Sequence, residues 1–376
     1  MTSVATSASL DAPLLLSDYD YELPPDRIAQ EPVSPRDSAR LLALDKRTGA
    51  LSHRIFRDLP DLLRPGDLLV VNETRVSAVR LLGTRAGSAT PMEALLLRPL
   101  IGGGALPDTW EALVRPGRRA RLGDQLHFFD AGLIAEVRAI TPSGGRVLRL
   151  TPDDKVSADP ADIVAERLTR HGRTPLPPYI TAPLGDRERY QTVYARTPGS
   201  AAAPTAGLHF TPELLVGIRE RGIAMATVRL DVGLGTFRPI RTDDVNAHIM
   251  HAEAFEVGEE TARAVNTCSG RVVAVGTTTL RALESATQQQ KTIAGADRIA
   301  RVRGETQLFV RPGYRFRAVD ALITNFHQPH STLLLLVAAF AGDTPAQGQA
   351  NLRAAYQTAL DQGYRFLSFG DAMFIH

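Results

Sequence analysis

The chain has 376 residues, of which 44% are hydrophobic and 22% charged, the composition of an ordinary soluble globular protein of about two domains. Its formal net charge is only +2, so any nucleic-acid site must be a local basic patch and not a polycationic surface. A single cysteine, Cys268, excludes an internal disulfide and a thiolate metal cluster, and it favours a reducing compartment such as the cytoplasm.

The N-terminal stretch lacks a basic region followed by an apolar segment, so we expect a frayed tail and not a signal peptide. The longest apolar run, 333–341, is far short of the ~20 residues that span a bilayer. We therefore expect no membrane association. Prolines between residues 19 and 44 forbid a long helix there, so this segment is expected to lie over the surface of a core domain.

Short strand-like runs recur from residue 62 to residue 151, separated by turns that contain glycine, proline or aspartate. This spacing is typical of an antiparallel barrel or sandwich, and we expect an inserted all-β, barrel-like domain over 62–151. One turn, RPGRRARLG, carries Arg115, Arg118, Arg119 and Arg121. These arginines could contact an RNA backbone or form a solvated hairpin tip, and the sequence leaves both open.

Helical and strand patterns alternate from residue 160 to the end of the chain. Alternation of this kind predicts an α/β domain, a largely parallel sheet with helices on its faces, built from residues 1–61 and 152–376. Thr211 followed by Pro212 predicts one helix start, and Ser331 predicts another before an apolar helix.

Several loops after predicted strands carry polar residues and glycines. Gly276 ends a buried strand, and Thr277 and Thr278 open the next helix with Arg281 one turn further on. Free N–H groups and the dipole at a helix start attract a carboxylate or a phosphate, so a ligand site is favoured over simple capping. Two more such loops are DVGLGTF, with Gly233, Gly235 and Thr236, and TNFHQPHST, with Asn325 and His327.

Candidate acid–base groups cluster in HIMHAEAF, which carries His248, His251 and Glu253. A histidine and a carboxylate in different environments can serve as base and acid at neutral pH. A metal site is less favoured, because the spacing is not that of the helical zinc motif. A purely structural network of these side chains is less favoured than acid–base catalysis and more favoured than a metal site. His209 lies between a glycine turn (Gly207) and the helix start at Thr211. This position makes it a stronger candidate for a functional residue than an isolated histidine would be.

From about residue 18 to residue 374 the chain carries a series of motifs that includes GDLLVVNETRV, AAPTAGLHFT, DVGLGTFRPI, HIMHAEAF, VAVGTTTLRALES, DALITNFHQPHSTLLLLVAAFAG and YRFLSFGDAMF. This series resembles the S-adenosylmethionine:tRNA ribosyltransferase-isomerase family of queuosine biosynthesis. Three positions depart from the family pattern. Glu73 stands for an aspartate, Gln328 for a leucine, and Asp231 for a common histidine, which would remove one candidate proton carrier or replace it with a carboxylate.

The resemblance implies an enzyme that transfers and isomerises the ribosyl part of S-adenosylmethionine onto 7-aminomethyl-7-deazaguanine at the tRNA wobble position, giving epoxyqueuosine tRNA, adenine and methionine. Deprotonation beside the sulfonium, protonation of the leaving adenine and deprotonation of the attacking amine are acid–base tasks, so no metal or prosthetic group is expected. The protein is expected to be a cytoplasmic monomer with tRNA and S-adenosylmethionine as its partners.

Matching the motifs to this chemistry gives three sets of expected site residues. The expected catalytic residues are His209, Asp231, His248, His251 and Glu253. The expected S-adenosylmethionine site comprises Thr205, Gly207, Gly233, Gly235, Thr236, Gly276, Thr277, Thr278, Arg281, Asn325 and His327. The expected tRNA contacts are Arg115, Arg118, Arg119 and Arg121.

Three other functions stay open on the residues alone. An S-adenosylmethionine-dependent RNA methyltransferase would share the co-substrate, but the glycine-rich fingerprint after a first strand is missing. A non-enzymatic RNA-binding module would use the β domain as its platform, but histidines in the α/β loops are then unexplained. A metal hydrolase would use His248, His251 and Glu253.

Overall fold

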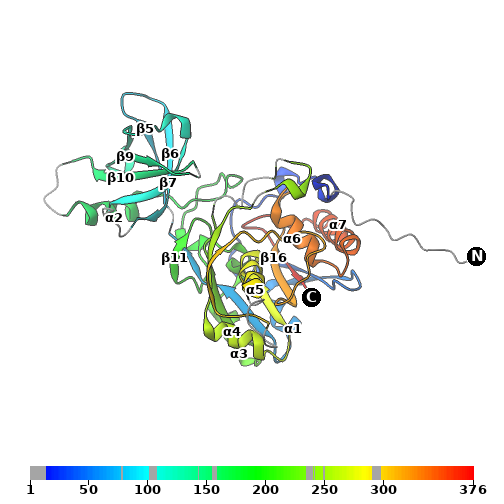
Figure 1. The fold of residues 1–376 in the computed structure, drawn as a ribbon. Coiled ribbons are helices and arrows are strands. Elements are labelled where there is room, and N and C mark those ends of the chain that lie inside the picture. The colour runs from blue at the N-terminus through cyan, green and yellow to red at the C-terminus, as the bar shows by residue number, and fades with distance from the viewer. Residues whose placement is uncertain are drawn as a thin grey trace, which may run out of the picture.

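The computed structural model describes residues 14–77, 79–100, 108–142, 144–154, 159–233, 240, 242–248, 250–289 and 298–376. These residues form a large mixed sheet covered by helices and a separate closed barrel (Figure 1). In spatial order the sheet strands are β15 (Val302–Thr306), β13 (Glu253–Val257), β12 (Ala224–Leu230), β3 (Leu68–Asn72), β14 (Val272–Val275), β16 (Ala321–Asn325), β17 (Ala372–Ile375), β1 (Arg40–Leu44) and β2 (Leu51–Ile55).

The centre of this sheet is parallel and its margins are mixed. Strands β12, β3, β14 and β16 run parallel to one another, and β17 runs parallel to β1. The remaining four pairings are antiparallel. The prediction of a largely parallel sheet is therefore not confirmed for the whole sheet. The alternation of helices and strands signals three of the four central strands, β12, β14 and β16, whereas β2, β13 and β15 add on at the edges with antiparallel neighbours.

Side-chain alternation along β3 explains how both faces of the sheet are covered. Leu68 and Val70 pack into one hydrophobic core, and Leu69 and Val71 pack into another on the opposite face. The first core includes side chains of α4 (Glu259–Thr267), α5 (Thr277–Gln289), α6 (Thr332–Phe340) and α7 (Pro345–Asp361). The second includes side chains of α1 (Leu59–Leu62) and α3 (Pro212–Glu220). A sheet buried on both faces requires apolar runs such as LLVV.

The closed barrel is antiparallel throughout. Its strands are, in spatial order, β10 (Arg146–Pro152), β7 (Thr109–Arg115), β6 (Pro91–Pro99), β5 (Val79–Arg85), β8 (Gln125–Phe128) and β9 (Leu133–Ile140). Helix α2 (Pro160–His171) packs Val164 and Leu168 onto the barrel core. A barrel over the middle of the chain is thus confirmed.

One boundary of the barrel differs from the prediction. The predicted range began at residue 62, yet β3 belongs to the nine-stranded sheet, and β4 (Thr74–Val76) pairs with β11 (Thr197–Ser200) outside the barrel. The first barrel strand begins at Val79. The sequence of β3 is apolar and short, as a barrel strand can also be, so its pattern did not distinguish the two sheets.

Candidate functional site

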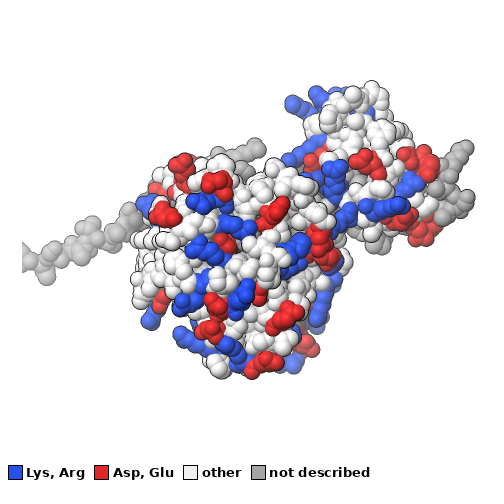
Figure 2. Space-filling view, turned by 180° about the vertical axis from the view of Figure 1, so that it is seen from behind, with Lys and Arg blue, Asp and Glu red and all other residues white. Residues whose placement is uncertain are grey.

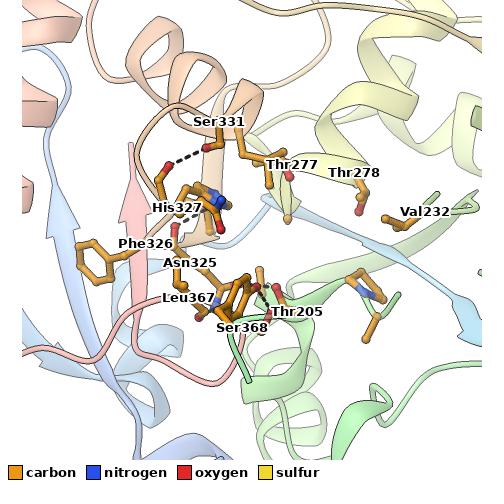
Figure 3. Close-up of a pocket in the computed structure, with 18 residues that line it drawn as sticks. Thr205, Val232, Thr277, Thr278, Asn325, Phe326, His327, Ser331, Leu367 and Ser368 are labelled. Carbon is orange, nitrogen blue, oxygen red and sulfur yellow. Dashed lines mark hydrogen bonds between the residues drawn. The ribbon is translucent and has the colours of Figure 1, made fainter. Parts of the chain in front are cut away.

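A pocket with about 650 Å³ of empty space, part of it open to solvent, lies beside the central strands (Figure 3). We call it the strand-end pocket. It is lined by Tyr179, Ala203, Pro204, Thr205, Ala206, Val232, Gly276, Thr277, Thr278, Thr324, Asn325, Phe326, His327, Gln328, Ser331, Leu333, Leu367 and Ser368. Its lining combines apolar side chains with a few polar groups, as small-molecule sites do.

The position of this pocket follows from the parallel centre of the sheet. Because β12, β14 and β16 run in the same direction, their carboxyl ends lie on one edge. Val232 follows β12, Gly276 follows β14, and Asn325 ends β16; all three line the pocket. Ligands of open α/β sheets bind at this kind of edge.

Two helices begin at the pocket. Gly276, with φ of +88°, makes the sharp turn from β14 into α5, a backbone conformation that glycine adopts without strain. Ser331 caps α6, because its Oγ accepts the Leu334 N–H at 3.1 Å, and Thr332 is the first residue of that helix. Ser331, Thr277 and Thr278 all line the pocket. Two N-terminal dipoles with free N–H groups therefore favour a negatively charged ligand group here.

A network of hydrogen bonds fixes one wall of the pocket (Figure 3). Thr205 Oγ1 donates to Asn325 Oδ1 at 2.8 Å, and Asn325 Nδ2 donates to the carbonyl oxygen of Leu367 at 3.3 Å. Leu367 has a φ of +70°, a left-handed conformation that a branched side chain rarely adopts. Backbone strain of this kind collects at ligand sites. Beside Leu367, the Ser368 hydroxyl is hydrogen-bonded to Tyr179 Oη at 2.7 Å.

His327 is held from three sides. Its Nε2 is hydrogen-bonded to Thr324 Oγ1 at 2.8 Å, its backbone N–H donates to Tyr356 Oη at 2.9 Å, and its carbonyl oxygen accepts from Tyr21 Oη. Burial lowers the pKa of His327 to about 3. The imidazole is therefore neutral at pH 7, with one donor and one acceptor nitrogen, and it brings no positive charge to the site. Its Nε2 is already used in the bond to Thr324.

Glu253 and Arg281 form an ion pair inside the protein, with exposed side-chain fractions of only 6% and 4%. Arg281 Nε also donates to the carbonyl oxygen of Leu308 at 3.1 Å. The other carboxylate oxygen of Glu253 accepts the backbone N–H of Gly233 at 2.9 Å. Neither charged side chain lines the strand-end pocket. The pair instead fixes the loop that follows β12, whose residue Val232 forms part of the pocket wall.

His209 and Gly207, expected in catalysis and binding, lie in the interior next to the pocket. The His209 ring nitrogens face two backbone carbonyl oxygens, of Ala206 at 3.1 Å and Gly370 at 2.9 Å, and burial lowers the pKa of this histidine. A Cβ on Gly207 would lie 2.1 Å from Tyr194 Oη, so this glycine allows close packing. Neither residue lines the pocket.

Asp231 points into a different hollow, which it shares with Trp110 of the barrel. Its carboxylate receives a bidentate contact from Arg229, at 3.0 and 2.7 Å, and a hydrogen bond from Thr74 Oγ1 at 2.8 Å. The residue that departs from the family pattern is thus a structural acceptor in this arrangement.

His248 and His251 lie on the segment before β13. Ile240, which precedes them in the chain, donates its N–H to the carbonyl oxygen of His330 at 2.9 Å, next to the pocket residue Ser331. The His248 ring packs edge-on against Phe309, and burial, with His251 nearby, lowers its pKa. His251 is exposed. The expected ligand residues Gly235 and Thr236 lie outside the described residues.

The pocket also contains residues that the sequence reasoning missed: Tyr179, Thr324, Leu367 and Ser368. Thr324 is inside β16, where its pattern reads as a strand residue. Leu367 and Ser368 belong to YRFLSFGDAMF, a motif without charged or histidine side chains at these two positions. The φ of Leu367 has no sequence signal, because leucine does not predict a left-handed conformation.

The arginine turn lies on the barrel. Arg118, Arg119 and Arg121 line a hollow together with Arg85, whereas Arg115 is exposed and does not line it. Within the described ranges, no three His, Cys, Asp or Glu side chains gather as a metal group would require. In the same part of the chain no helix is long and apolar enough to cross a membrane.

Together, these features define an α/β protein with a barrel inserted into it and a small-ligand pocket at the carboxyl edge of its parallel strands. A family model described as queuosine biosynthesis protein matches residues 16–375, so the chain belongs to that family. It is 50% identical over 364 residues to a protein of Moorella thermoacetica named S-adenosylmethionine:tRNA ribosyltransferase-isomerase, covering 96% of this chain and 99% of that one.

Another relative with this name, from Heliobacterium modesticaldum, is 50% identical over 363 residues, covering 95% of this chain and 98% of that protein. Among solved structures, the chain resembles the crystal structure of S-adenosylmethionine tRNA ribosyltransferase from Thermotoga maritima. That match has a TM-score of 0.51 and 34% identity, and it covers 96% of this chain and all of the other.

Proposed function

We propose that the protein is an S-adenosylmethionine:tRNA ribosyltransferase-isomerase. It transfers and isomerises the ribosyl moiety of S-adenosylmethionine onto 7-aminomethyl-7-deazaguanine at the tRNA wobble position, forming epoxyqueuosine tRNA and releasing adenine and methionine. The observation that carries the proposal is 50% identity, over 96% of the chain, to a relative with that name. At this identity and coverage an RNA methyltransferase or a non-enzymatic RNA-binding module is not favoured.

We propose that S-adenosylmethionine occupies the strand-end pocket. Two helix starts supply N–H groups at Thr277 and next to Ser331, which suit the methionine carboxylate. Asn325 and neutral His327 supply hydrogen-bonding groups of both kinds for uncharged polar parts of the co-substrate. The lining also includes Val232, Phe326 and Leu333, which suit apolar surface of the ligand. Gly233 shapes this wall through its contact with Glu253.

The proposed acid–base roles divide the expected catalytic residues into two groups. His209, Asp231 and Glu253 are tied by hydrogen bonds or ion pairs within the protein, and we assign them to positioning. His248 and His251 remain the proposed proton carriers. The lowered pKa of His248 leaves it neutral at pH 7, as a base requires, and its segment begins beside the pocket at Ile240.

The barrel and its arginine turn are proposed to bind the tRNA, and the protein is proposed to act as a cytoplasmic monomer. Basic side chains contact the phosphate backbone and set the register, while base contacts in the sheet body would specify the modified base. This division assigns the barrel (79–152) to the macromolecular substrate and the sheet body to the co-substrate.

The test is product analysis by mass spectrometry. The protein is mixed with S-adenosylmethionine and tRNA that carries the deazaguanine base, and the small products are identified. Free adenine and methionine in equal amounts are expected. S-adenosylhomocysteine in place of adenine would refute ribosyl transfer and favour methyl transfer. No turnover at all, with tRNA binding intact, would favour the binding-module alternative.

A further inference from the structure

The turns of the barrel divide into two ends. The chain enters β5 from the sheet body, and because the barrel is antiparallel, the β5–β6, β7–β8 and β9–β10 turns lie at the end away from that entry. β5 alone has seven residues, which corresponds to roughly 23 Å of extended chain. Any group bound at the far end is therefore about one barrel length from the point where the barrel joins the sheet body.

A basic hollow lies at this far end. Its lining residues are Arg85, Ser88, Thr90, Met92, Arg118, Arg119 and Arg121. Four of the seven side chains are guanidinium groups and none is a carboxylate. Arg85 has a weak ion pair with Asp124 at 3.6 Å, and Arg119 donates to Thr90 Oγ1 at 3.0 Å. Figure 2 shows basic side chains at the upper edge of the barrel, and both acidic and basic ones lower down.

The loop that carries three of these arginines is held from inside by a fifth, Arg146. This side chain belongs to a residue only 7% exposed, and it donates to the carbonyl oxygens of Ala120 at 2.7 Å, Gly144 at 2.7 Å and Gly145 at 2.9 Å. It also donates to the carbonyl oxygen of Gly117. A buried charge that is used entirely to fix backbone carbonyls preorganises the loop, so the arginines next to it are presented without further ordering.

We propose that this basic hollow is a phosphate-binding site for the backbone of the tRNA, with Arg85 as a member and Arg146 as its positioning residue. The inference rests on the proposed function. It adds a defined site at the far end of the barrel and two residues outside the arginine turn, Arg85 and Arg146.

The chemistry of the hollow fits a phosphodiester. Guanidinium groups bind phosphate oxygens in a bidentate manner, and hydroxyls of Ser88 and Thr90 add further hydrogen bonds. Its distance from the strand-end pocket favours a long polyanion over a free anion, since only a ligand with phosphates repeated along its length can touch the barrel end and still place one base at the sheet edge. A-form RNA is recognised largely through such backbone contacts.

The test compares a triple variant, Arg85→Ala/Arg118→Ala/Arg121→Ala, with the wild-type protein in titrations of fluorescent tRNA at several salt concentrations. We expect binding to weaken at least tenfold near 0.1 M salt. The slope of log K against log salt should become shallower by about two to three, roughly one for each phosphate that is no longer neutralised. Arg263→Ala is the matched control, because this arginine on α4 is 68% exposed and also pairs with a carboxylate.

Steady-state adenine release separates this proposal from the proposed function. The triple variant should have a raised KM for tRNA and a near-normal kcat at saturation. If wild-type protein releases no adenine, the proposed function fails, while the binding titrations still decide the phosphate site. Wild-type affinity and slope in the triple variant would overturn the site. A second result would also overturn the site: inorganic phosphate binds in the hollow at micromolar concentration and does not compete with tRNA. The hollow would then be a site for a free anion.

Arg146→Lys tests the positioning role. Lysine keeps the positive charge but cannot reach the carbonyl oxygens of both turns with a planar fork. We expect weaker tRNA binding with a shallower salt slope in protein that remains folded. Unchanged binding in a folded Arg146→Lys protein would contradict preorganisation of the loop. If Arg146→Lys lowers stability, the binding titrations of the triple variant still decide whether the hollow binds phosphate.

Discussion

Replacing Glu253 with glutamine separates a positioning role of this residue from a catalytic one. In the wild type the Gly233 N–H donates to a Glu253 carboxylate oxygen at 2.9 Å. Glutamine keeps an oxygen that can accept this N–H, but it removes the charge that faces Arg281. The guanidinium of Arg281, on a side chain 4% exposed, then stays buried without its carboxylate partner. A positioning role therefore predicts a loss of stability, together with a disturbed loop after β12.

The size of that loss follows from the burial of the pair. Removing one partner of a buried ion pair costs about 3–5 kcal/mol, since the remaining charge is desolvated and unpaired. Glutamine retains one hydrogen bond, so we expect the lower end, about 3 kcal/mol. For a folded body of more than 250 residues a change of 1 kcal/mol moves the melting temperature by about 2 °C. The Glu253→Gln protein should therefore melt about 6 °C below the wild type.

The assay is thermal unfolding by circular dichroism, run beside Glu256→Gln as a control. Glu256 lies on the same strand, but its side chain is 42% exposed and 3.8 Å from Arg303, and exposed pairs contribute only about 0–1 kcal/mol. Its melting temperature should hardly change. If Glu253→Gln abolished turnover while melting at the wild-type temperature, Glu253 would be a proton carrier, and the positioning assignment would be refuted.

Three further predictions concern the pocket and its support. Gly207→Ala should cost about 1–3 kcal/mol through overpacking against Tyr194 Oη, measured by denaturant unfolding; weaker S-adenosylmethionine binding at full stability would contradict this. Asn325→Asp should weaken S-adenosylmethionine binding more than Asn325→Ala in calorimetric titration, because it adds a negative charge to the same pocket in which the two helix starts are proposed to hold the carboxylate; an equal effect of the two substitutions would argue against an anion in this pocket. The pKa of His327 is about 3 in the folded protein and about 6.5 in the unfolded chain. Between these two pH values the unfolded chain carries a proton on this histidine that the folded protein does not carry. The free energy of unfolding should therefore fall as pH drops from about 6.5 toward about 3, by up to about 1.4 kcal/mol per pH unit, and His327→Gln should flatten this dependence in urea titrations at pH 7 and 5.

Local sequence signals identified residues that line the pocket better than they identified residues free to act in catalysis. Gly276, Thr277, Asn325 and His327 were expected at strand ends and helix starts, and all four line the pocket. This works because a glycine after a buried strand and a threonine at a helix start are local features, and parallel strands bring their carboxyl ends to one edge without further information.

The residues expected in catalysis show what local signals leave out. Whether a histidine or carboxylate is free to act depends on partners distant in the chain. Glu253 meets Arg281, 28 residues away, and His209 faces the carbonyl of Gly370, 161 residues away. No pattern within HIMHAEAF or GLHFT contains these partners. Asp231 shows the same limit, because its hydrogen bond from Thr74 spans 157 residues.

The connection between the barrel and the pocket has its own structural basis. The chain leaves β3 at Asn72, whose side chain bonds the backbone of Leu230 at 2.9 and 3.1 Å and donates to Thr278 Oγ1 at 3.3 Å. The side chain of Gln191 then holds both backbone groups of Val76, at 3.0 and 2.9 Å. The described residues that lead to the barrel, as far as Ser77, are thus bonded to the sheet body at the edge where the pocket lies.

This attachment matters for a substrate that must touch both parts. If tRNA phosphates bind at the far end of the barrel, the position of the modified base relative to the pocket is set by the barrel and by the paired strands β4 and β11. A flexible tether would leave that distance undefined, and the binding free energy gained at the barrel would not orient the base. Hydrogen bonds from Gln191 and Asn72 hold the start of the connection against the sheet body, which favours backbone contacts on the barrel that position a base for reaction at the sheet edge.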